Sequence, residues 1–332
     1  MSTTEAAFLF AGSLVLTVTS SVVLSRRIEQ LGKWLLLSES LLGILAALGA
    51  DAPEISSSLS ALRSGQHDLG LGIVFGSNIL NLAALLGMSA VLAGKVQVSR
   101  RTLYLNGCVA VGVMTLTTVE LYGILSPVVS VILIAVIMSI YVTLTSASPA
   151  LIQRVARIVG LGGQLGQTVT DANRDAEKPE TPRRPSYADI LDVLPSLVCI
   201  ILASVGLVRS ALVLGAAWKI PMAVLGTLIL ASLTSIPNVV TAVHLALRGR
   251  GSAVLSESLN SNTLNLIAGV SLPALFFGRL SLNPRSVLSL WWLVGMTLLA
   301  LGLSFIRGGL GRKSGVLLVI VYIVFAFLMV FT

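Results

Sequence analysis

The chain has 332 residues, of which 55% are hydrophobic and 11% are charged, and its mean hydropathy is +0.95. This composition excludes an ordinary water-soluble globular protein and indicates a membrane protein. The two cysteines, Cys108 and Cys199, lie in separate apolar stretches, so a disulfide framework and cysteine-based metal clusters are also excluded. The formal charge of +8 gains a meaning only once its position relative to the membrane is known.

Apolar stretches long enough to cross a bilayer, which takes about 20 residues, recur along the whole chain. The first begins behind MSTTE, without a basic n-region or a small-residue cleavage site, so we interpret it as a retained helix and not as a signal peptide. We therefore predict an all-α polytopic membrane protein with ten transmembrane helices, at about residues 6–25, 34–62, 69–94, 102–120, 124–147, 187–208, 217–247, 252–278, 286–306 and 315–332.

The basic residues sort sharply between alternate loops, with 17 on one side and 5 on the other. Because cytoplasmic loops retain Lys and Arg, this split predicts a multi-pass protein with both termini outside. The positive charge is then an orientation signal, and nucleic acid is not an expected partner. Residues 148–186 are rich in charge and proline, which predicts a cytoplasmic linker between two five-helix halves, residues 1–147 and 187–332.

An internal repeat is the most informative feature of the sequence. GSNILNL at residues 76–82 matches NSNTLNL at residues 260–266, with an offset of 184 residues. The two copies, at about 41–87 and 225–271, are separated by an odd number of predicted spans, so they are expected to be threaded in opposite senses and to meet near the membrane midplane. The same offset aligns Pro53 with Pro237, Glu54 with Asn238, Gly65 with Gly249, Ser77 with Ser261, Asn78 with Asn262 and Asn81 with Asn265.

Each copy has a proline in the middle of a predicted span. Pro53 removes the hydrogen-bond donor for the Gly49 carbonyl, and Pro237 does the same for Leu233. A broken helix with free carbonyl oxygens is costly in hydrocarbon unless a bound cation or a Ser or Thr hydroxyl satisfies them. Two breaks in register, each followed by an ionisable or amide residue, favour the functional interpretation.

Polar oxygen ligands follow helical spacing within these spans. Carboxylate, amide and hydroxyl oxygens without Cys or His are typical of sites for hard cations such as calcium, sodium or protons. An Asp at a helix centre costs at least ~2.5 kcal/mol on insertion scales, so such residues are functional by default. The rows are Asp51, Glu54 and Ser58; Ser77 and Asn81; and Glu257, Ser261 and Asn265.

Two of these residues, and two neighbouring asparagines of the repeat, have a structural interpretation. Asp51 is equally well suited to capping the helix that begins at Pro53. Glu257 could be an interfacial carboxylate near Arg250. Asn78 and Asn262 could bond helix to helix without touching an ion.

The segment LGADAPEISSSLSALRSGQHDLGLGIVFGSNILNLAALLG resembles the first alpha repeat of the calcium/cation antiporter superfamily, which includes the sodium/calcium exchangers. In that family a Gly-x-x-x-Pro-Glu break is followed by Gly-Ser-Asn-x-x-Asn on the next span. The resemblance implies a ten-helix inverted-repeat exchanger that alternates access to a central site. It implies transported cations, calcium against sodium or protons, and no resident cofactor.

The resemblance also implies site residues. Glu54 matches the first-repeat glutamate, Ser77 and Asn81 match ligands of the next span, and Thr234, Ser235 and Ser261 match their second-repeat counterparts. This sequence departs from the family pattern at three positions. Asn238 and Asn265 stand where the family has acidic ligands, whereas Asp51 stands where the family has Ser or Thr.

The remaining acidic groups define the expected function. Asp51 and Glu54 give the site a charge of at most −2, with Glu257 as a further candidate, which is enough for one divalent or two monovalent ions. Two like charges one turn apart also favour proton coupling. We therefore predict a secondary active antiporter that exchanges Ca²⁺ for H⁺ or Na⁺, and the alternative within the family is an antiporter of Mg²⁺, Na⁺ or K⁺.

Two other classes are less favoured. An intramembrane aspartyl enzyme needs two facing aspartates, and only Asp51 lies in mid-span. A channel needs a repeated selectivity filter, which no loop resembles. The expected partners are the lipid bilayer and inorganic cations, the expected state is a monomer or weak homo-oligomer, and the short loops favour the inner membrane of a prokaryotic cell.

Overall fold

The computed structural model describes residues 1–34, 44, 47–146 and 192–331. The predicted linker at 148–186 and parts of the predicted spans at 34–62 and 187–208 lie outside these residues. The helical segments of the first half are α1 (Thr3–Trp34), α3 (Ala52–Arg63), α4 (His67–Leu80), η1 (Asn81–Met88), α5 (Ser89–Ala93), α6 (Arg100–Leu121) and α7 (Pro127–Ser146). Those of the second half are α11 (Val193–Ala217), α12 (Met222–Val224), η2 (Leu225–Leu230), α13 (Ala231–Thr234), α14 (Ile236–Leu247), α15 (Gly251–Leu266), η3 (Ile267–Ser271), α16 (Leu272–Phe277), α17 (Pro284–Arg307) and α18 (Arg312–Phe331), where η marks a π-helical segment.

The fold confirms an all-α polytopic membrane protein. Within the described residues, seven helices are long and apolar enough to cross a membrane, and a bent pair, Met222–Thr234 with Ile236–Leu247, makes an eighth. Two of the ten predicted spans are not among them. The span predicted at 34–62 is described only in part, and the one predicted at 252–278 is helical from Gly251 to Phe277 but contains Asn260, Asn262 and Asn265, which lower its hydropathy.

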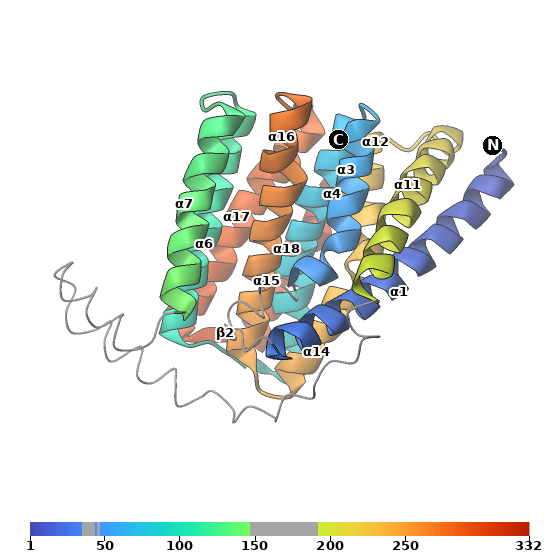
Figure 1. Ribbon diagram of the computed structural model, residues 1–332. Coiled ribbons are helices and arrows are strands. Elements are labelled where there is room, and N and C mark those ends of the chain that lie inside the picture. Colours follow the sequence, from blue (N-terminus) through green and yellow to red (C-terminus); the bar gives the residue numbers. More distant parts are fainter. Residues whose placement is uncertain (35–43, 45–46, 147–191, 332) are drawn as a thin grey trace.

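A short antiparallel sheet joins the two halves and was not predicted. Strand β1 (Lys95–Gln97) pairs with β2 (Gly309–Gly311), with Val96 opposite Leu310. The strands follow α5 and α17 and lie at the lower end of the molecule in Figure 1. Three-residue strands between apolar helices have no periodicity of their own in the sequence, because alternation needs at least four residues to be recognised.

The two repeat units run in opposite directions. The turn from α3 to α4 lies at the upper end of the molecule, and the turn from α14 to α15 lies at the lower end (Figure 1). In each turn a glycine ends the preceding helix with a left-handed backbone, Gly65 at φ 73° and Gly249 at φ 75°. Both chain ends lie at the upper side (Figure 1), as an even number of spans requires.

The predicted breaks at the two prolines are present. The chain bends at Asp51 before α3, and it bends by 50° at Ser235 between α13 and α14. At the first break the Ser21 hydroxyl of α1 lies 3.1 Å from the Gly49 carbonyl oxygen and 3.2 Å from that of Ala50. A serine hydroxyl therefore partly satisfies the carbonyls that Pro53 leaves without a donor, as the structural alternative had it.

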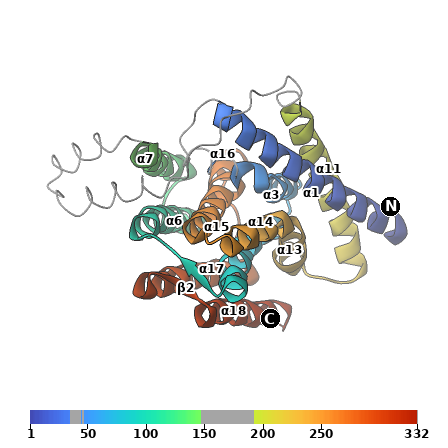
Figure 2. The same cartoon turned by 90° about the horizontal axis from the view of Figure 1, so that it is seen from below.

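The central helix of the molecule is the continuous segment of α4, η1 and α5. In its most apolar stretch of 18 residues, 94% of the residues are buried, compared with 22% in the corresponding stretch of α1. Seen from below, α15 and α14 lie beside it and α1 with α11 flank one edge (Figure 2). Helix α4 crosses η2 so closely that a Cβ atom on Gly76 would overlap the carbonyl group of Thr227. This approach packs the first repeat directly against the second.

Candidate functional site

Two carboxylates at the start of α3, Asp51 just before the helix and Glu54 in its first turn, meet the second repeat in the middle of the molecule. Asp51 and Glu54 both have no exposed surface. The Ser235 hydroxyl donates a hydrogen bond of 2.8 Å to Glu54 Oε1. Asn238 Nδ2 and the Ser261 hydroxyl each donate to Asp51 Oδ1 at 2.7 Å. Both fully buried acidic groups of the first repeat thus accept hydrogen bonds from side chains of the second.

These contacts follow the sequence repeat. A shift of 184 residues replaces Asp51 by Ser235 and Glu54 by Asn238. The contact between Glu54 and Ser235 and the contact between Asp51 and Asn238 are therefore equivalent positions related by the internal two-fold symmetry. The first repeat supplies the carboxylate in both contacts, Glu54 in one and Asp51 in the other. The second repeat supplies only neutral groups, Ser235 and Asn238.

The amides of α4 and α15 form a second layer with the same symmetry. Asn78 Nδ2 donates to the Asn262 carbonyl at 3.0 Å, and Asn262 Nδ2 donates to the Asn78 carbonyl at 3.1 Å. Asn81 Nδ2 donates to Asn262 Oδ1 at 3.1 Å, and the equivalent Asn265 Nδ2 donates to Asn78 Oδ1 at 3.1 Å. Asn81 Nδ2 also donates to Ser261 Oγ at 2.8 Å. Asn78 and Asn262 therefore bond helix to helix, the second of the two interpretations given to them.

Several oxygens in this region are buried and accept no hydrogen bond within the described residues. They belong to two carboxylates and three amides. Each is a hard oxygen ligand, of the kind that binds cations such as calcium or sodium, and the carboxylates can also take up a proton. A buried oxygen without a partner is costly, so this group of atoms fits a cation that binds between the repeats. The atoms are Asp51 Oδ2, Glu54 Oε2, Asn81 Oδ1, Asn238 Oδ1 and Asn265 Oδ1.

The composition of this group limits its chemistry. Among the described residues, no three His, Cys, Asp or Glu side chains lie close enough to hold a metal ion together. Any ion between the repeats would therefore need amide and hydroxyl oxygens besides the two carboxylates. Such a ligand set discriminates against transition metals, which prefer Cys and His.

The other residues predicted for the site lie around this centre. The Ser77 hydroxyl donates to the Val74 carbonyl at 3.1 Å and accepts from Asn265 Nδ2 of the other repeat at 3.5 Å. The Thr234 hydroxyl donates to the Leu230 carbonyl at 3.0 Å, four residues earlier, and both side chains are buried. Asp51 makes no side-chain cap hydrogen bond to α3, which removes the capping alternative. Its carboxylate is engaged across the repeat interface.

Glu257 lies one helical turn before Ser261 on α15. It is partly exposed, yet its Oε2 atom is buried without a hydrogen-bond partner. Both Glu257 and Arg250 are described, and no ion pair joins them, so the interfacial pairing considered from the sequence is not present. Glu257 thus remains a candidate at the edge of the site.

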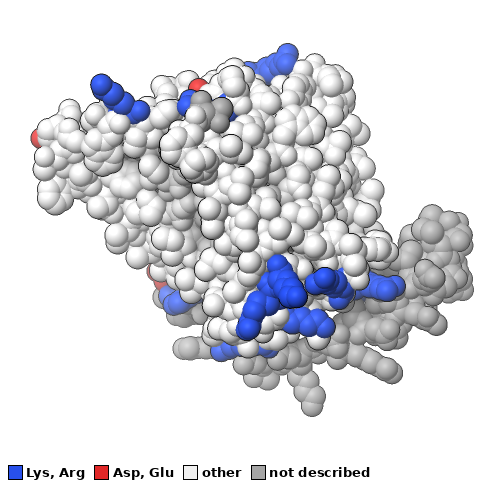
Figure 3. Space-filling model, turned by 180° about the vertical axis from the view of Figure 1, so that it is seen from behind, with Lys and Arg blue, Asp and Glu red and all other residues white. Residues whose placement is uncertain are grey.

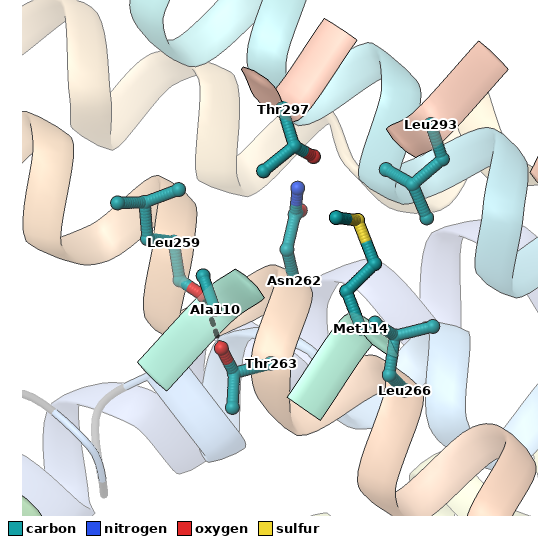
Figure 4. A pocket seen from close by; sticks show the side chains of 8 residues that line it. All are labelled: Ala110, Met114, Leu259, Asn262, Thr263, Leu266, Leu293 and Thr297. Atoms are coloured by element: carbon teal, nitrogen blue, oxygen red, sulfur yellow. Dashed lines mark hydrogen bonds between the residues drawn. The ribbon is translucent and has the colours of Figure 1, made fainter. Parts of the chain in front are cut away.

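A small pocket lies on the side of α15 that faces α6 and α17. Figure 4 shows Asn262 pointing into it toward Thr297 and Met114. Its other lining residues are Ala110, Leu259, Thr263, Leu266 and Leu293. The lining is mainly apolar and contains neither carboxylate, so the pocket is not the ion site that the sequence predicts.

Sequence reasoning missed one buried carboxylate. Glu120, at the end of α6, is only 3% exposed, and neither of its carboxylate oxygens accepts a hydrogen bond. The sequence did carry a signal, an acidic residue inside an apolar stretch, but Glu120 is the last residue of the predicted span at 102–120, where the sequence alone does not show whether a side chain is buried.

Two oppositely threaded broken-helix units around buried carboxylates and amides define a class, the inverted-repeat membrane transporters of inorganic cations. Comparison with models of known protein families identifies the family within this class. The model of the family described as "Sodium/calcium exchanger protein" matches residues 5–148 and 191–331, so the chain belongs to the sodium/calcium exchanger family. It is a membrane transporter, and the alternative of an intramembrane enzyme is set aside.

Curated relatives match part of the chain. It is 32% identical over 126 residues to the sodium/potassium/calcium exchanger Nckx30C of Drosophila melanogaster, a match that covers 38% of this chain and 14% of that protein. It is 32% identical over 118 residues to sodium/potassium/calcium exchanger 1 of Bos taurus, covering 35% of this chain and 10% of that protein. The match thus spans a small part of these longer relatives.

Solved structures match nearly the whole chain. The H⁺/Ca²⁺ exchanger CAX has a TM-score of 0.73 at 15% identity, over 98% of this chain and 86% of that one. YfkE has a TM-score of 0.68 at 15% identity, over 98% and 93%. The sodium-calcium exchanger NCX_Mj has a TM-score of 0.62 at 22% identity, over 97% and 98%. These likenesses confirm the fold.

Proposed function

We propose that this chain is a secondary active antiporter that exchanges Ca²⁺ for H⁺ or Na⁺ by alternating access to a site between the two repeats. The observation that carries the proposal is the contact of Asp51 and Glu54 with Asn238, Ser235 and Ser261, which leaves one oxygen of each carboxylate buried without a partner. The names of the relatives, exchangers of calcium for sodium with potassium or for protons, support the same choice of ions.

The proposed ligands are the two carboxylates and the oxygens around them. Ca²⁺ takes 6–8 oxygen ligands in flexible geometry, which a mixed set of carboxylate, amide and hydroxyl groups can supply. Two carboxylates neutralise one divalent ion or two monovalent ions, so the same atoms can hold either exchanged species in turn. Asp51, Glu54, Asn81, Asn238 and Asn265 are the inner ligands, and Ser77, Thr234, Ser235, Ser261 and Glu257 surround them.

The experiment that tests the proposal is exchange in proteoliposomes that contain the purified full chain. We expect uptake of radioactive Ca²⁺ when the lumen is loaded with Na⁺ or is more acidic than the medium, and no uptake in symmetric solutions. Uptake down a calcium gradient without any counter-ion would indicate a channel. Absence of Ca²⁺ uptake under both gradients would refute calcium exchange.

A second candidate is antiport of another cation, Mg²⁺, Na⁺ or K⁺. The observation in its favour is that the second repeat contributes only neutral amides, Asn238 and Asn265, to the buried oxygens. Neutral amides give the site a weaker negative electrostatic potential than carboxylates would, so it selects less strongly for a divalent ion. Thermal unfolding of the protein with each cation in turn distinguishes the candidates, because an ion that binds the folded state raises the melting temperature.

We further propose that the end with the sheet faces the cytoplasm of a prokaryotic cell and that residues 1–147 and 187–332 are the two halves. Figure 3 supports this orientation, because Lys and Arg gather at the lower end of the molecule. Lys95 in β1, Arg248 in the turn after α14 and Arg312 at the start of α18 belong to that end. Basic residues are retained on the cytoplasmic side.

Two equivalent turns of the repeat offer a matched test of this orientation. Ser64 and Arg248 are exposed and are related by the offset of 184 residues. In a background with Cys108 and Cys199 replaced by serine, a membrane-impermeant maleimide added to intact cells should label Ser64→Cys and should label Arg248→Cys only after permeabilisation. The reverse pattern would show that both termini face the cytoplasm.

A further inference from the structure

Glu120 is a buried carboxylate outside the site between the repeats. It lies one residue before the end of α6, is 3% exposed, and has no hydrogen-bond partner at either carboxylate oxygen. An ionisable group inside a membrane span is expensive and almost always faces a partner or a pathway. In its charged form this carboxylate needs a compensating group, and a bound cation is one that its surroundings could hold.

Hydroxyl groups from three segments surround the carboxylate. Thr117 lies one turn earlier on α6, Ser130 is on α7 and Ser271 ends η3, and all three have no exposed surface. The Ser130 and Ser271 hydroxyls lie beside the Glu120 carboxylate, close enough to favour its charged form, although no hydrogen bond joins either of them to it within the described residues. Ser271 Oγ lies 3.1 Å from Thr117 Oγ1, and Ser130 Oγ has no hydrogen-bond partner within the described residues. Five oxygens from four side chains thus converge on one buried place.

A basic side chain does not provide the compensation. A basic group at this end is Arg279, whose guanidinium donates to the Tyr122 carbonyl at 2.6 Å and so caps the end of α6. No ion pair joins Arg279 to Glu120. The residue that the repeat places opposite Glu120 is Ser304, whose hydroxyl donates to the Ala300 carbonyl. The cluster therefore has no symmetry mate and is separate from the two-fold site.

We propose that Glu120, Thr117, Ser130 and Ser271 form a second cation site, which binds a single Na⁺. One carboxylate supplies one negative charge, so a monovalent ion leaves the buried cluster neutral, whereas a divalent ion would leave a net charge in a low dielectric. Carboxylate and hydroxyl oxygens are ligands for a hard cation. The site holds α6 and α7 against η3 when it is occupied.

The position of Ser271 connects the two sites. Helix α15 carries Ser261 and Asn265, and η3 continues it without a break to Ser271. A cation bound at Glu120 therefore restrains the end of the helix whose middle faces Asp51. The proposal itself concerns binding at Glu120 and does not depend on which ions the chain exchanges.

The test is thermal unfolding of the full chain as NaCl replaces choline chloride at constant ionic strength. A background with Asp51→Asn and Glu54→Gln removes the charge of the site between the repeats. We expect this background to keep a sodium-dependent rise in melting temperature, and we expect the added Glu120→Gln change to abolish it, because binding to the folded state is what produces the rise.

A milder variant keeps the proposal testable if Glu120→Gln does not fold. Ser130→Ala removes one ligand and keeps the charge, so the half-saturating sodium concentration should rise about tenfold. Ser304→Ala is the matched control, a buried serine at the repeat-equivalent position, and it should leave that concentration unchanged. If the background shows no response to sodium, or if neither Glu120→Gln nor Ser130→Ala alters the response, Glu120 is not a sodium site.

Discussion

Glu54→Gln is expected to abolish cation exchange in proteoliposomes, reducing it to the level of protein-free vesicles, while the protein still folds and inserts. Glu54 Oε1 accepts a hydrogen bond of 2.8 Å from the Ser235 hydroxyl, and a glutamine amide oxygen can accept the same bond. The substitution keeps the volume of the side chain and removes its charge. Half of the −2 charge proposed for the site is lost, so one Ca²⁺ is no longer neutralised.

The control for this prediction is the same chemical change at an exposed position. Glu5 lies in the first turn of α1, where its Oε2 accepts from the Ser2 amide. Glu5→Gln should retain exchange at the wild-type rate. Full exchange by Glu54→Gln would place the transported ion elsewhere in the molecule, and the proposed ligand set would then be wrong. The melting temperatures of both variants, measured without added ions, show whether the fold is intact.

The repeat and its inverted threading could be predicted because they depend on residues whose effect on the backbone is local. Pro53 and Pro237 mark the two breaks, and the left-handed turns at Gly65 and Gly249 end the helices that follow. These features depend on a residue's own backbone, since only proline lacks the amide donor and only glycine adopts a positive φ without strain. An offset of 184 residues between them was enough to infer the architecture.

Contacts across the interface could not be predicted, because they depend on how far the helices are rotated against each other. The sequence left ligation and helix capping equally open for Asp51, whereas in the structure it accepts hydrogen bonds from Asn238 and Ser261 of the other repeat. Glu120 was missed for a related reason. Its burial comes from α7 and η3, which pack over the end of α6, and hydropathy along one helix contains no information about such neighbours.

The 2.7 Å contact between Asp51 and Asn238 offers an explanation for the absence of a glutamate at position 238 of the second repeat. The resemblance to the exchanger family gives a Ser or Thr at position 51 and a Glu at position 238. In this chain the acidic group of that contact is on the opposite partner, Asp51. We propose that Asp51 performs the role that the second-repeat glutamate has in the family, so that each of the two equivalent contacts has one carboxylate.

If the carboxylate of this contact can come from either residue 51 or residue 238, a double variant that moves it from one to the other should be active. Asp51→Ser alone should weaken Ca²⁺ binding at least about tenfold, because it leaves Glu54 as the only charge at the centre. Asn238→Glu alone places a second carboxylate against Asp51 at hydrogen-bond distance, which should lower stability without an ion. Asp51→Ser combined with Asn238→Glu should restore Ca²⁺ affinity to within about threefold of the wild type, since contacting residues couple strongly.

A control variant distinguishes rescue at this contact from a general effect of added charge. Asn260 lies on α15 and its Oδ1 accepts from the Tyr141 hydroxyl at 3.1 Å, a bond that a glutamate could also accept. Asp51→Ser combined with Asn260→Glu restores the same net charge at a position outside the proposed ligands, so Ca²⁺ affinity should remain as weak as in Asp51→Ser. Calcium titrations followed by thermal unfolding measure the four variants and the wild type. Equal rescue by both double variants would mean that net charge alone sets affinity, and that Asp51 does not replace the second-repeat carboxylate.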